Sequence, residues 1–464
     1  MSDSTASKKL LPRLGCFGWA FVALALSLLA VAAALMIWSR GVERDVRARL
    51  EQLRAAGEPL TPDDLADVYR LPPSLPDSSR FWLSAIEPLD GEAFVAACAK
   101  GRLDEVLDGK IPPPGEPWPQ LADARELLAQ YAPTLRALHD AAADPGGVRY
   151  PMRFGDGIAM LVPHAQRLRG AARLLALEAQ VKAHDGDAAG ATAAIRTGFT
   201  AARTLEHDPI LVVLFVRIAC DGVARSQIEQ LLSKVEFSDA DLARLRADLQ
   251  QARYQDGLLR AMQGERVIGL ATIRNPAQAL AEPDTSLGGD APFGGLRLFR
   301  GNDTRSYLEC MELVVDQAKL PPPQALAGMK RIDADVAAMM GGGSMTARIR
   351  NPLTSLLVPA LSAVFSATAR GTASKDTADA ALAVEQFRRL HGRLPERLDD
   401  LVPDFMPSVP TDAFDGKPLR YIVRPDRYVV YSVGQDLIDQ GGVKGATPND
   451  SGDLTFEVEA GNRR

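Results

Sequence analysis

The longest apolar segment of the chain is Phe17 to Trp38, which holds 22 residues and no charged side chain. A helix of this length rises by about 33 Å, enough to cross the ~30 Å hydrocarbon layer of a bilayer. Trp19 and Trp38 stand near its two ends, where indole rings favour the membrane interface. We therefore expect a transmembrane anchor over residues 17–38. A cleaved signal peptide is the alternative because small residues such as Ala30 and Ala32 are present, but the apolar segment continues past them.

The charges that flank this segment bear on its orientation. Lys8, Lys9 and Arg13 precede it, whereas four arginines between positions 40 and 49 follow it, so the positive-inside comparison is nearly balanced. A short basic tail ahead of a first span favours a cytoplasmic location for residues 1–16. We therefore expect a single-pass protein of the inner (cytoplasmic) membrane with an extracytoplasmic body.

Residues 39–350 carry helical periodicity without strand-like alternation, which predicts a mainly helical body. The predicted helices are a charged stalk at Gly41–Ala56, a helix starting at Pro62 behind the N-cap Thr61, Leu121–Ala142, a buried core helix within Pro209–Leu232, Leu242–Met262 behind the cap Ser238, Ser306–Ala318 and Gln324–Met340. Residues 275–304 are rich in Gly, Pro and Asp, and are predicted to form a loop.

The helical pattern is strongest between about 159 and 272. Leu168 and Leu175 mark the apolar face of one helix, which His184-Asp185-Gly186 ends, and Asp187 opens a second helix. The short turn between them predicts an antiparallel helix pair.

With Gly186, Ala191 and Ile195 at matching offsets, residues 177–202 resemble part of a tetratricopeptide repeat. Gly198 stands where that family has alanine, and the pattern does not recur at a period of about 34 residues. The resemblance therefore implies a helix pair rather than a solenoid.

Charge and cysteine content narrow the possible functions. The net charge is −6, and no stretch concentrates Lys and Arg with aromatics, so we expect no nucleic-acid partner. The four cysteines, Cys16, Cys98, Cys220 and Cys310, stand singly, which argues against a zinc or dithiol motif. We expect them to be small buried hydrophobic residues.

Local catalytic motifs are absent from the sequence. The run Gly341 to Ser344 is followed by Met345-Thr346 and lacks the lysine of a phosphate-binding loop. His164 could act as a base with Asp156 nearby, although an isolated helical histidine is more often a packing residue. We therefore predict that the protein is not an enzyme.

Asn351 to Ala369 is a second uncharged stretch, of 19 residues. A second span here would return the C-terminal region to the side of the N-terminus. Pro352, Pro359 and three serines lower its hydrophobicity, so we favour a linker helix.

The C-terminal pattern changes from helix to strand. The predicted elements are a helix at Asp379–His391 with an apolar stripe through Phe387 and Leu390, a short helix at Glu396–Val402, a tight turn at Asp415-Gly416, and two antiparallel strands, Leu419–Val423 and Arg427–Gly434. Together with the linker, they predict an α+β domain over residues 351–464.

Three segments occur there in a characteristic order: EQFRRLHGRLPERLDDLVP, VPTDAFDGKPLRY and YVVYSVGQDLIDQGG. In this order, residues from about 361 to 453 resemble the C-terminal domain of the major pseudopilin of type II secretion systems. The resemblance implies a helix packed on a small antiparallel sheet, with Phe387 and Leu390 covering one face and Val429 and Tyr431 as their contacts. Gly15 to Trp19 lacks the cleavage site and glutamate that pseudopilins carry at the start of their apolar helix, so polymerisation into a pilus is not expected.

In that family a calcium ion fixes the final acidic loop. By resemblance, Asp436 and Asp439 lie in the corresponding loop, with Asp450 and Asp453 further along. Calcium prefers hard oxygen ligands, which these carboxylates supply. The four aspartates are therefore candidate calcium ligands, and a solvated acidic loop is the alternative.

These features predict a membrane-anchored extracytoplasmic scaffold or interaction protein of the bacterial envelope, linked to secretion machinery by the resemblance. Its partners would be the membrane and other proteins. The alternative is an extracytoplasmic hydrolase whose site is assembled from distant residues without a local motif.

Overall fold

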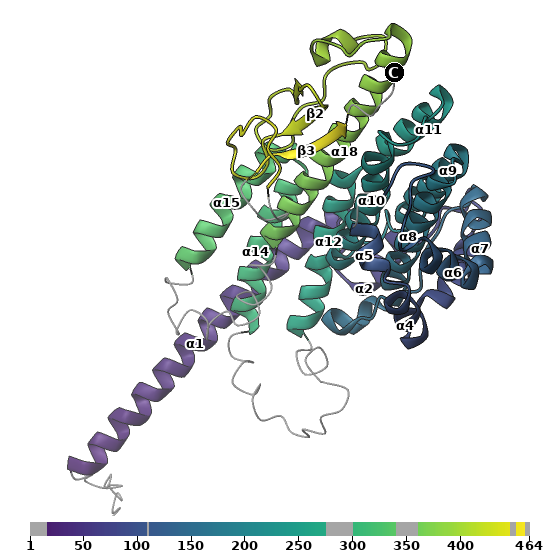
Figure 1. Cartoon of the computed structure of the whole chain (residues 1–464). Helices are drawn as coiled ribbons and strands as arrows, with labels where there is room; N and C mark the ends of the chain where they lie inside the picture. Colours follow the sequence, from purple (N-terminus) through teal and green to yellow (C-terminus); the bar gives the residue numbers. More distant parts are fainter. Residues whose placement is uncertain (1–15, 109–110, 275–299, 340–360, 446–451, 460–464) are drawn as a thin grey trace, which may run out of the picture.

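The computed structural model describes residues 16–108, 111–274, 300–339, 361–445 and 452–459. Within these ranges the chain is mostly helical, with a small three-stranded sheet near the C-terminus (Figure 1). The predicted fold class is thus confirmed at the level of a helical protein that carries one apolar N-terminal helix and a small sheet.

The first helix, α1 (Cys16–Ala55), joins the predicted anchor and stalk without a break. Among the described helices, α1 is the one that is long and apolar enough to cross a membrane. None of its apolar window is buried. Beyond it, α1 packs along α14 (Arg300–Ala318), where Val42 is buried and Arg49 forms ion pairs with Glu309 and Glu312 at 3.1 and 2.9 Å (Figure 1). The apolar and docked halves are therefore one rod.

Short helices follow α1. They are α2 (Pro62–Tyr69), α3 (Ser79–Ile86), η1 (Glu87–Leu89), α4 (Glu92–Lys100), α5 (Leu103–Asp108), α6 (Leu121–Gln130), α7 (Ala132–Ala143) and η2 (Phe154–Ala159). Thr61 caps α2 in a reciprocal capping box with Asp64, so the predicted helix start is confirmed. The single helix predicted at Leu121–Ala142 is wrong, because Pro133 lacks an N–H and begins a new first turn after Tyr131.

The predicted helix pair is present as α8 (Pro163–His184) and α9 (Ala188–Arg203). Gly186 adopts φ +81° between them, and the Asp187 side chain caps α9 at Gly190 N. The buried helix α10 (Leu211–Leu231) packs against both. These three helices form the centre of the body.

Two helices replace the single one predicted at Leu242–Met262. They are α11 (Asp239–Gln250), capped by Ser238 as predicted, and α12 (Tyr254–Arg274). The break lets Tyr254 enter the core, where its ring lies 5.6 Å from the guanidinium carbon of Arg217.

The next helices are α14 and α15 (Pro322–Met339). Of the loop predicted at 275–304, residues 275–299 lie outside the described ranges, and Arg300 to Thr304 form the first turn of α14 instead. The glycine run after Met340 also lies outside them.

The C-terminal region begins with α18 (Leu361–His391), much longer than the predicted Asp379–His391. Residues 351–360 of the candidate second span lie outside the described ranges, but Val364 and Phe365 are buried in the protein core. The remaining elements are η6 (Leu398–Leu401), β1 (Arg420–Val423), β2 (Arg427–Ser432) and β3 (Leu454–Glu459).

The sheet has the order β1-β2-β3, with both neighbouring pairs antiparallel. The predicted antiparallel pairing of β1 and β2 is confirmed, and the structure places Tyr421 opposite Val430. The edge strand β3 was not predicted. It pairs with the other edge of β2, where Phe456 lies opposite Val430.

The packing of α18 on this sheet differs from the prediction in two ways. Phe387 is buried, but Leu390 is 71% exposed at the end of the helix. Tyr428 faces α18, because its hydroxyl donates to Ala381 O at 3.2 Å and contacts Glu385 at 3.0 Å. Since successive strand residues face opposite sides, Val429 and Tyr431 lie on the other face, where Gly442 covers them.

The sheet also belongs to the main core. Buried residues of α8, α9 and α10 join those of α18, β2 and β3 in one hydrophobic cluster. In addition, Arg246 of α11 binds Asp379 at 2.8 Å and Phe405 O at 2.6 Å. The body therefore holds the C-terminal sheet in place.

Candidate functional site

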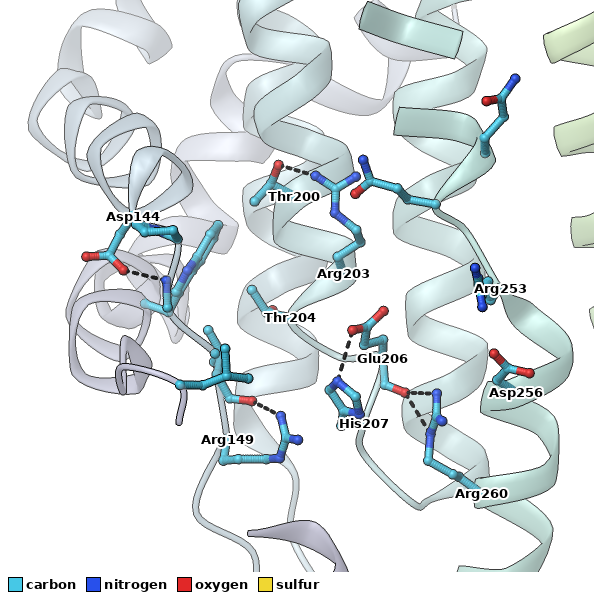
Figure 2. A pocket seen from close by; sticks show the side chains of 18 of the residues that line it. Asp144, Arg149, Thr200, Arg203, Thr204, Glu206, His207, Arg253, Asp256 and Arg260 are labelled. Carbon is cyan, nitrogen blue, oxygen red and sulfur yellow. Dashed lines mark hydrogen bonds and ion pairs between the residues drawn. The ribbon is translucent and has the colours of Figure 1, made fainter. Parts of the chain in front are cut away.

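A polar pocket of about 680 Å³ opens on the helical body between the loop after α7, the end of α9, and the α11–α12 junction (Figure 2). Its charged or hydroxyl-bearing lining residues are Asp144, Arg149, Thr200, Arg203, Thr204, Glu206, His207, Arg253, Asp256 and Arg260. Four arginines from three separate parts of the chain meet there.

Arg149 and Arg260 reach the pocket from different elements, and both donate hydrogen bonds to backbone carbonyl oxygens. Arg149 Nε donates to Tyr69 O at 2.6 Å, and Nη1 donates to Val148 O at 2.7 Å. Arg260 donates from Nε and Nη2 to Glu206 O at 3.2 and 2.8 Å. Carbonyls hold these groups in place without cancelling their charge. Burial lowers the pKa of both arginines, and for Arg260 the nearby charge of Arg217 lowers it further.

The other two arginines differ in their pairing. Arg203 binds the buried carboxylate of Asp248 at 3.1 Å, and Arg196 binds the same carboxylate at 2.7 Å. Arg253 is exposed at the rim and, within the described residues, has no hydrogen bond or ion pair.

Glu206 is the pocket carboxylate with the most contacts. Its side chain lies 2.9 Å from His207 Nε2 and 3.8 Å from Arg217 Nη2. Burial alone would raise the pKa of Glu206, but the hydrogen bond from His207 and the charges of His207, Arg217 and Arg260 outweigh it and lower that pKa. Glu206 is therefore held ionised beside the guanidinium groups of Arg217 and Arg260.

The two hydroxyls in the wall are not placed for nucleophilic chemistry. Thr200 donates to Arg196 O at 3.0 Å, and Thr204 donates to Ala201 O at 2.7 Å. Each proton is thus committed to a helix carbonyl rather than to a base.

Beneath the pocket lies a buried polar network. His164 Nε2 lies 2.9 Å from Asp208, whose other oxygen accepts a hydrogen bond from Tyr69 at 2.7 Å. The His164 ring stacks on Tyr150 at 4.4 Å between centroids, and Tyr150 donates to Thr204 at 2.9 Å. The suggested pairing of His164 with Asp156 is wrong, because Asp208 is its carboxylate partner. Both groups are almost completely buried, so they support the wall rather than face a substrate.

The candidate calcium ligands lie in the loop between β2 and β3. Asp436 accepts a hydrogen bond from Ile438 N at 3.0 Å, and Asp439 accepts one from Gly441 N at 2.9 Å. Asp453 is buried and accepts a hydrogen bond from Gly442 N at 2.7 Å. Asp450 lies outside the described residues.

Among the residues that the structure describes, no group of three or more His, Cys, Asp or Glu side chains is placed to hold a metal ion. Since one of the four candidates lies outside these ranges, the calcium site stays a prediction. The three buried cysteines, Cys98, Cys220 and Cys310, are free thiols.

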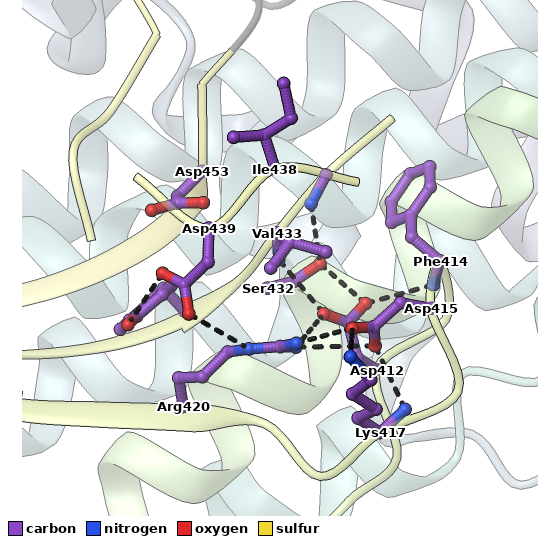
Figure 3. Close-up of polar contacts among 12 residues, drawn as sticks. Asp412, Phe414, Asp415, Lys417, Arg420, Ser432, Val433, Ile438, Asp439 and Asp453 are labelled. Carbon is purple, nitrogen blue, oxygen red and sulfur yellow. Dashed lines mark hydrogen bonds and ion pairs between the residues drawn. The ribbon is translucent and has the colours of Figure 1, made fainter. Parts of the chain in front are cut away.

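A second polar cluster lies beside this loop and involves the VPTDAFDGKPLRY segment (Figure 3). Asp412 is fully buried and accepts hydrogen bonds from Ser432 Oγ at 2.7 Å and Val433 N at 3.0 Å. Arg420 pairs with Asp412 at 2.8 Å and also with Asp415. The cluster thus ties the turn before β1 to the end of β2.

Sequence reasoning found this turn but missed the arginine pocket. The pocket arginines stand singly between positions 149 and 260, without common spacing. The available signal was the excess of Arg over Lys in the composition, which does not show where arginines meet in space. Their meeting depends on helix packing.

Comparisons of the chain with family models, curated proteins and solved structures found no match.

Proposed function

We propose that this chain is a membrane-anchored, non-catalytic interaction protein of the bacterial envelope, with its body outside the cytoplasm. The observation that carries the proposal is the construction of α1. None of its apolar window is buried, whereas its charged continuation docks on α14 through Arg49. An exposed apolar helix of this length is stable in a bilayer, and the docked half fixes the body to it.

A binding role is favoured by the polar groups of the body. In the pocket, Thr200 and Thr204 donate to helix carbonyls, and Glu206 is held between His207 and Arg217. The buried His164–Asp208 pair has no access to solvent. These arrangements suit recognition better than the hydrolase alternative, which needs an activated nucleophile or water.

The C-terminal region supports a place near secretion machinery. A long helix on a small antiparallel sheet is the arrangement that the pseudopilin resemblance implies, and α18 with β1, β2 and β3 has that form. The exposed face of this region would then be the surface that meets protein partners.

The membrane topology is tested with reporter fusions. Alkaline phosphatase is active only outside the cytoplasm, so a fusion after Arg464 should be active, and a cytoplasmic reporter at the same position should be inactive. The matched control is the same fusion on a chain that lacks residues 17–38, which should reverse both results. An inactive phosphatase fusion on the full chain would overturn the extracytoplasmic placement.

The interaction role is tested by affinity isolation of the detergent-solubilised full chain after cross-linking in cells. We expect envelope proteins to be enriched over a control consisting of α1 fused to an unrelated domain. Turnover of an ester, peptide or glycoside substrate by the purified chain, abolished by a pocket substitution such as Glu206→Gln, would contradict the non-catalytic assignment.

A further inference from the structure

We propose that the arginine pocket binds a water-soluble small molecule through its phosphate or carboxylate groups, with Arg149, Arg253 and Arg260 as the recognising cations. The volume of about 680 Å³ is in the range of small-molecule sites. Guanidinium groups bind carboxylate and phosphate oxygens through paired N–H donors, so several of them around one cavity favour an anionic ligand.

The pairing of the charges leaves the cationic groups in excess. Arg203 is balanced by Asp248, and Glu206 is matched by Arg217 and contacts His207. Asp144 is turned into its own loop, where Gly146 N and Ser78 Oγ donate to it. Its carboxylate stays charged, so Asp144 and the exposed Asp256 stand against three arginines, none of which forms an ion pair with a carboxylate among the described residues.

A buried guanidinium, that of Arg217, lies behind the pocket and is incompletely paired. Arg217 is only 1% exposed, and none of its three side-chain nitrogens has a hydrogen-bond partner in the described structure. Its Nη2 points to Glu206 in the pocket wall at 3.8 Å. A buried cation that is incompletely paired is costly, and an anion in the adjacent cavity would relieve that cost.

The position of the pocket argues for a soluble ligand rather than a lipid headgroup. The end of α14 nearer to the membrane is its N-terminal end, where Gly301 lies beside Val42 of α1. At the other end of α14, Ala318 O accepts a hydrogen bond from Gln255, at the same end of α12 as Arg253. These levels are separated by about 25 Å of helix, whereas a headgroup layer is only about 5–8 Å thick.

The test is calorimetric titration of the full chain in nanodiscs with inorganic pyrophosphate and, separately, citrate, at constant ionic strength. We expect one of these anions to bind with 1:1 stoichiometry and a Kd below about 1 mM. Pyrophosphate alone would assign a phosphate ligand, citrate alone a carboxylate ligand, and both a site for either oxyanion. Binding of neither anion would overturn the proposal.

Three variants locate the site. Arg260→Gln and Arg253→Gln should each weaken binding about tenfold or more, since each removes a charged donor. Arg397→Gln makes the same charge change at an exposed position on another part of the surface and should leave the Kd unchanged. Within the described residues Arg253 has no hydrogen bond or ion pair to lose, so its variant should keep the unfolding temperature of the parent and separates binding from folding. An equal effect of all three variants would show bulk electrostatics and overturn the site.

The same titration tests whether the ligand is a lipid headgroup. Nanodiscs of neutral and of anionic phospholipid should give the same Kd. Competition by the anionic lipid would show that headgroups reach the pocket and would overturn the soluble-ligand assignment.

Discussion

The guanidinium of Arg266 lies 2.8 Å from the carboxylate of Glu58, and the arginine is almost completely buried. Gln263 donates to the same carboxylate at 2.8 Å, and Pro59 O accepts from Arg266 at 3.2 Å. Glu58 follows the end of α1, so this contact fastens the rod to α12 and therefore to the body.

Glu58→Ala should destabilise the full chain by about 3–5 kcal/mol, because it leaves the Arg266 charge buried without its carboxylate. The measurement is denaturant unfolding in detergent, and the control is Glu51→Ala on the exposed side of α1, expected within about 0.5 kcal/mol of the parent. Equal stability of both variants would mean that the rod is not fastened at this point.

The same contact predicts a pH dependence. Burial alone would raise the pKa of Glu58, but hydrogen bonds from Arg266 and Gln263 and the charge of Arg266 outweigh it, so the folded pKa lies below the ordinary value of 4.5. A carboxyl with a lowered folded pKa binds protons more readily when unfolded. Its stabilisation is therefore complete above pH 4.5 and is lost as pH falls through the folded pKa. The stability difference between the parent and Glu58→Gln should be constant from pH 6 to 8 and should shrink below about pH 4.5.

Local signals predicted the parts of the fold that depend on near neighbours. Thr61 and Ser238 were expected to cap helices and Asp187 to open one, and the side chain of each accepts a hydrogen bond from a backbone N–H of the first turn. The antiparallel pairing of β1 and β2 also follows from adjacent residues, since the intervening turn is short. In these cases the residues that determine the local structure are close together in the sequence.

Long-range packing decided the rest. Strand alternation showed that Tyr428 and Val429 face opposite sides, but the choice of side depends on whether α18 or the later loop covers each one. Likewise, Arg149 and Arg260 are 111 positions apart and line the same pocket only because packing places the loop after α7 beside α12. Neither relation is encoded in a local window.

Asp412→Ala should unfold the C-terminal region, at a cost of about 3–5 kcal/mol. The substitution removes an ion pair with Arg420 and leaves Val433 N and Ser432 without their buried acceptor. Hydrogen exchange of full-length protein should show β1 and β2 losing protection. Asp426→Ala, at an exposed turn between the same strands, is the control and should leave that protection unchanged.

Leu214→Ala should cost about 2–5 kcal/mol, because Leu214 is only 3% exposed and truncation leaves a cavity between α10 and α12. Val212 belongs to the same apolar run but is 45% exposed, so Val212→Ala should cost much less. If thermal unfolding gives the two variants the same stability, α10 faces a partner or lipid and the assigned core is wrong.

Calcium should raise the unfolding temperature of the full chain if the acidic loop holds the ion, since a ligand that binds only the folded state stabilises it by mass action. Burial raises the pKa of Asp453, and the charge of Asp439 adds to that rise, so a divalent cation would relieve both effects. Because protons compete for the same carboxylates, the shift in millimolar calcium should grow between pH 4 and 7.

Asp436→Ala and Asp439→Ala should abolish the calcium-dependent shift, while Asp426→Ala, on an exposed turn, should retain it. Magnesium at the same concentration should give a smaller shift, because it keeps its water ligands. An unfolding temperature that calcium does not change would leave the sheet and its polar cluster intact and would make the loop a solvated acidic surface, held by hydrogen bonds such as those at Asp436, Asp439 and Asp453.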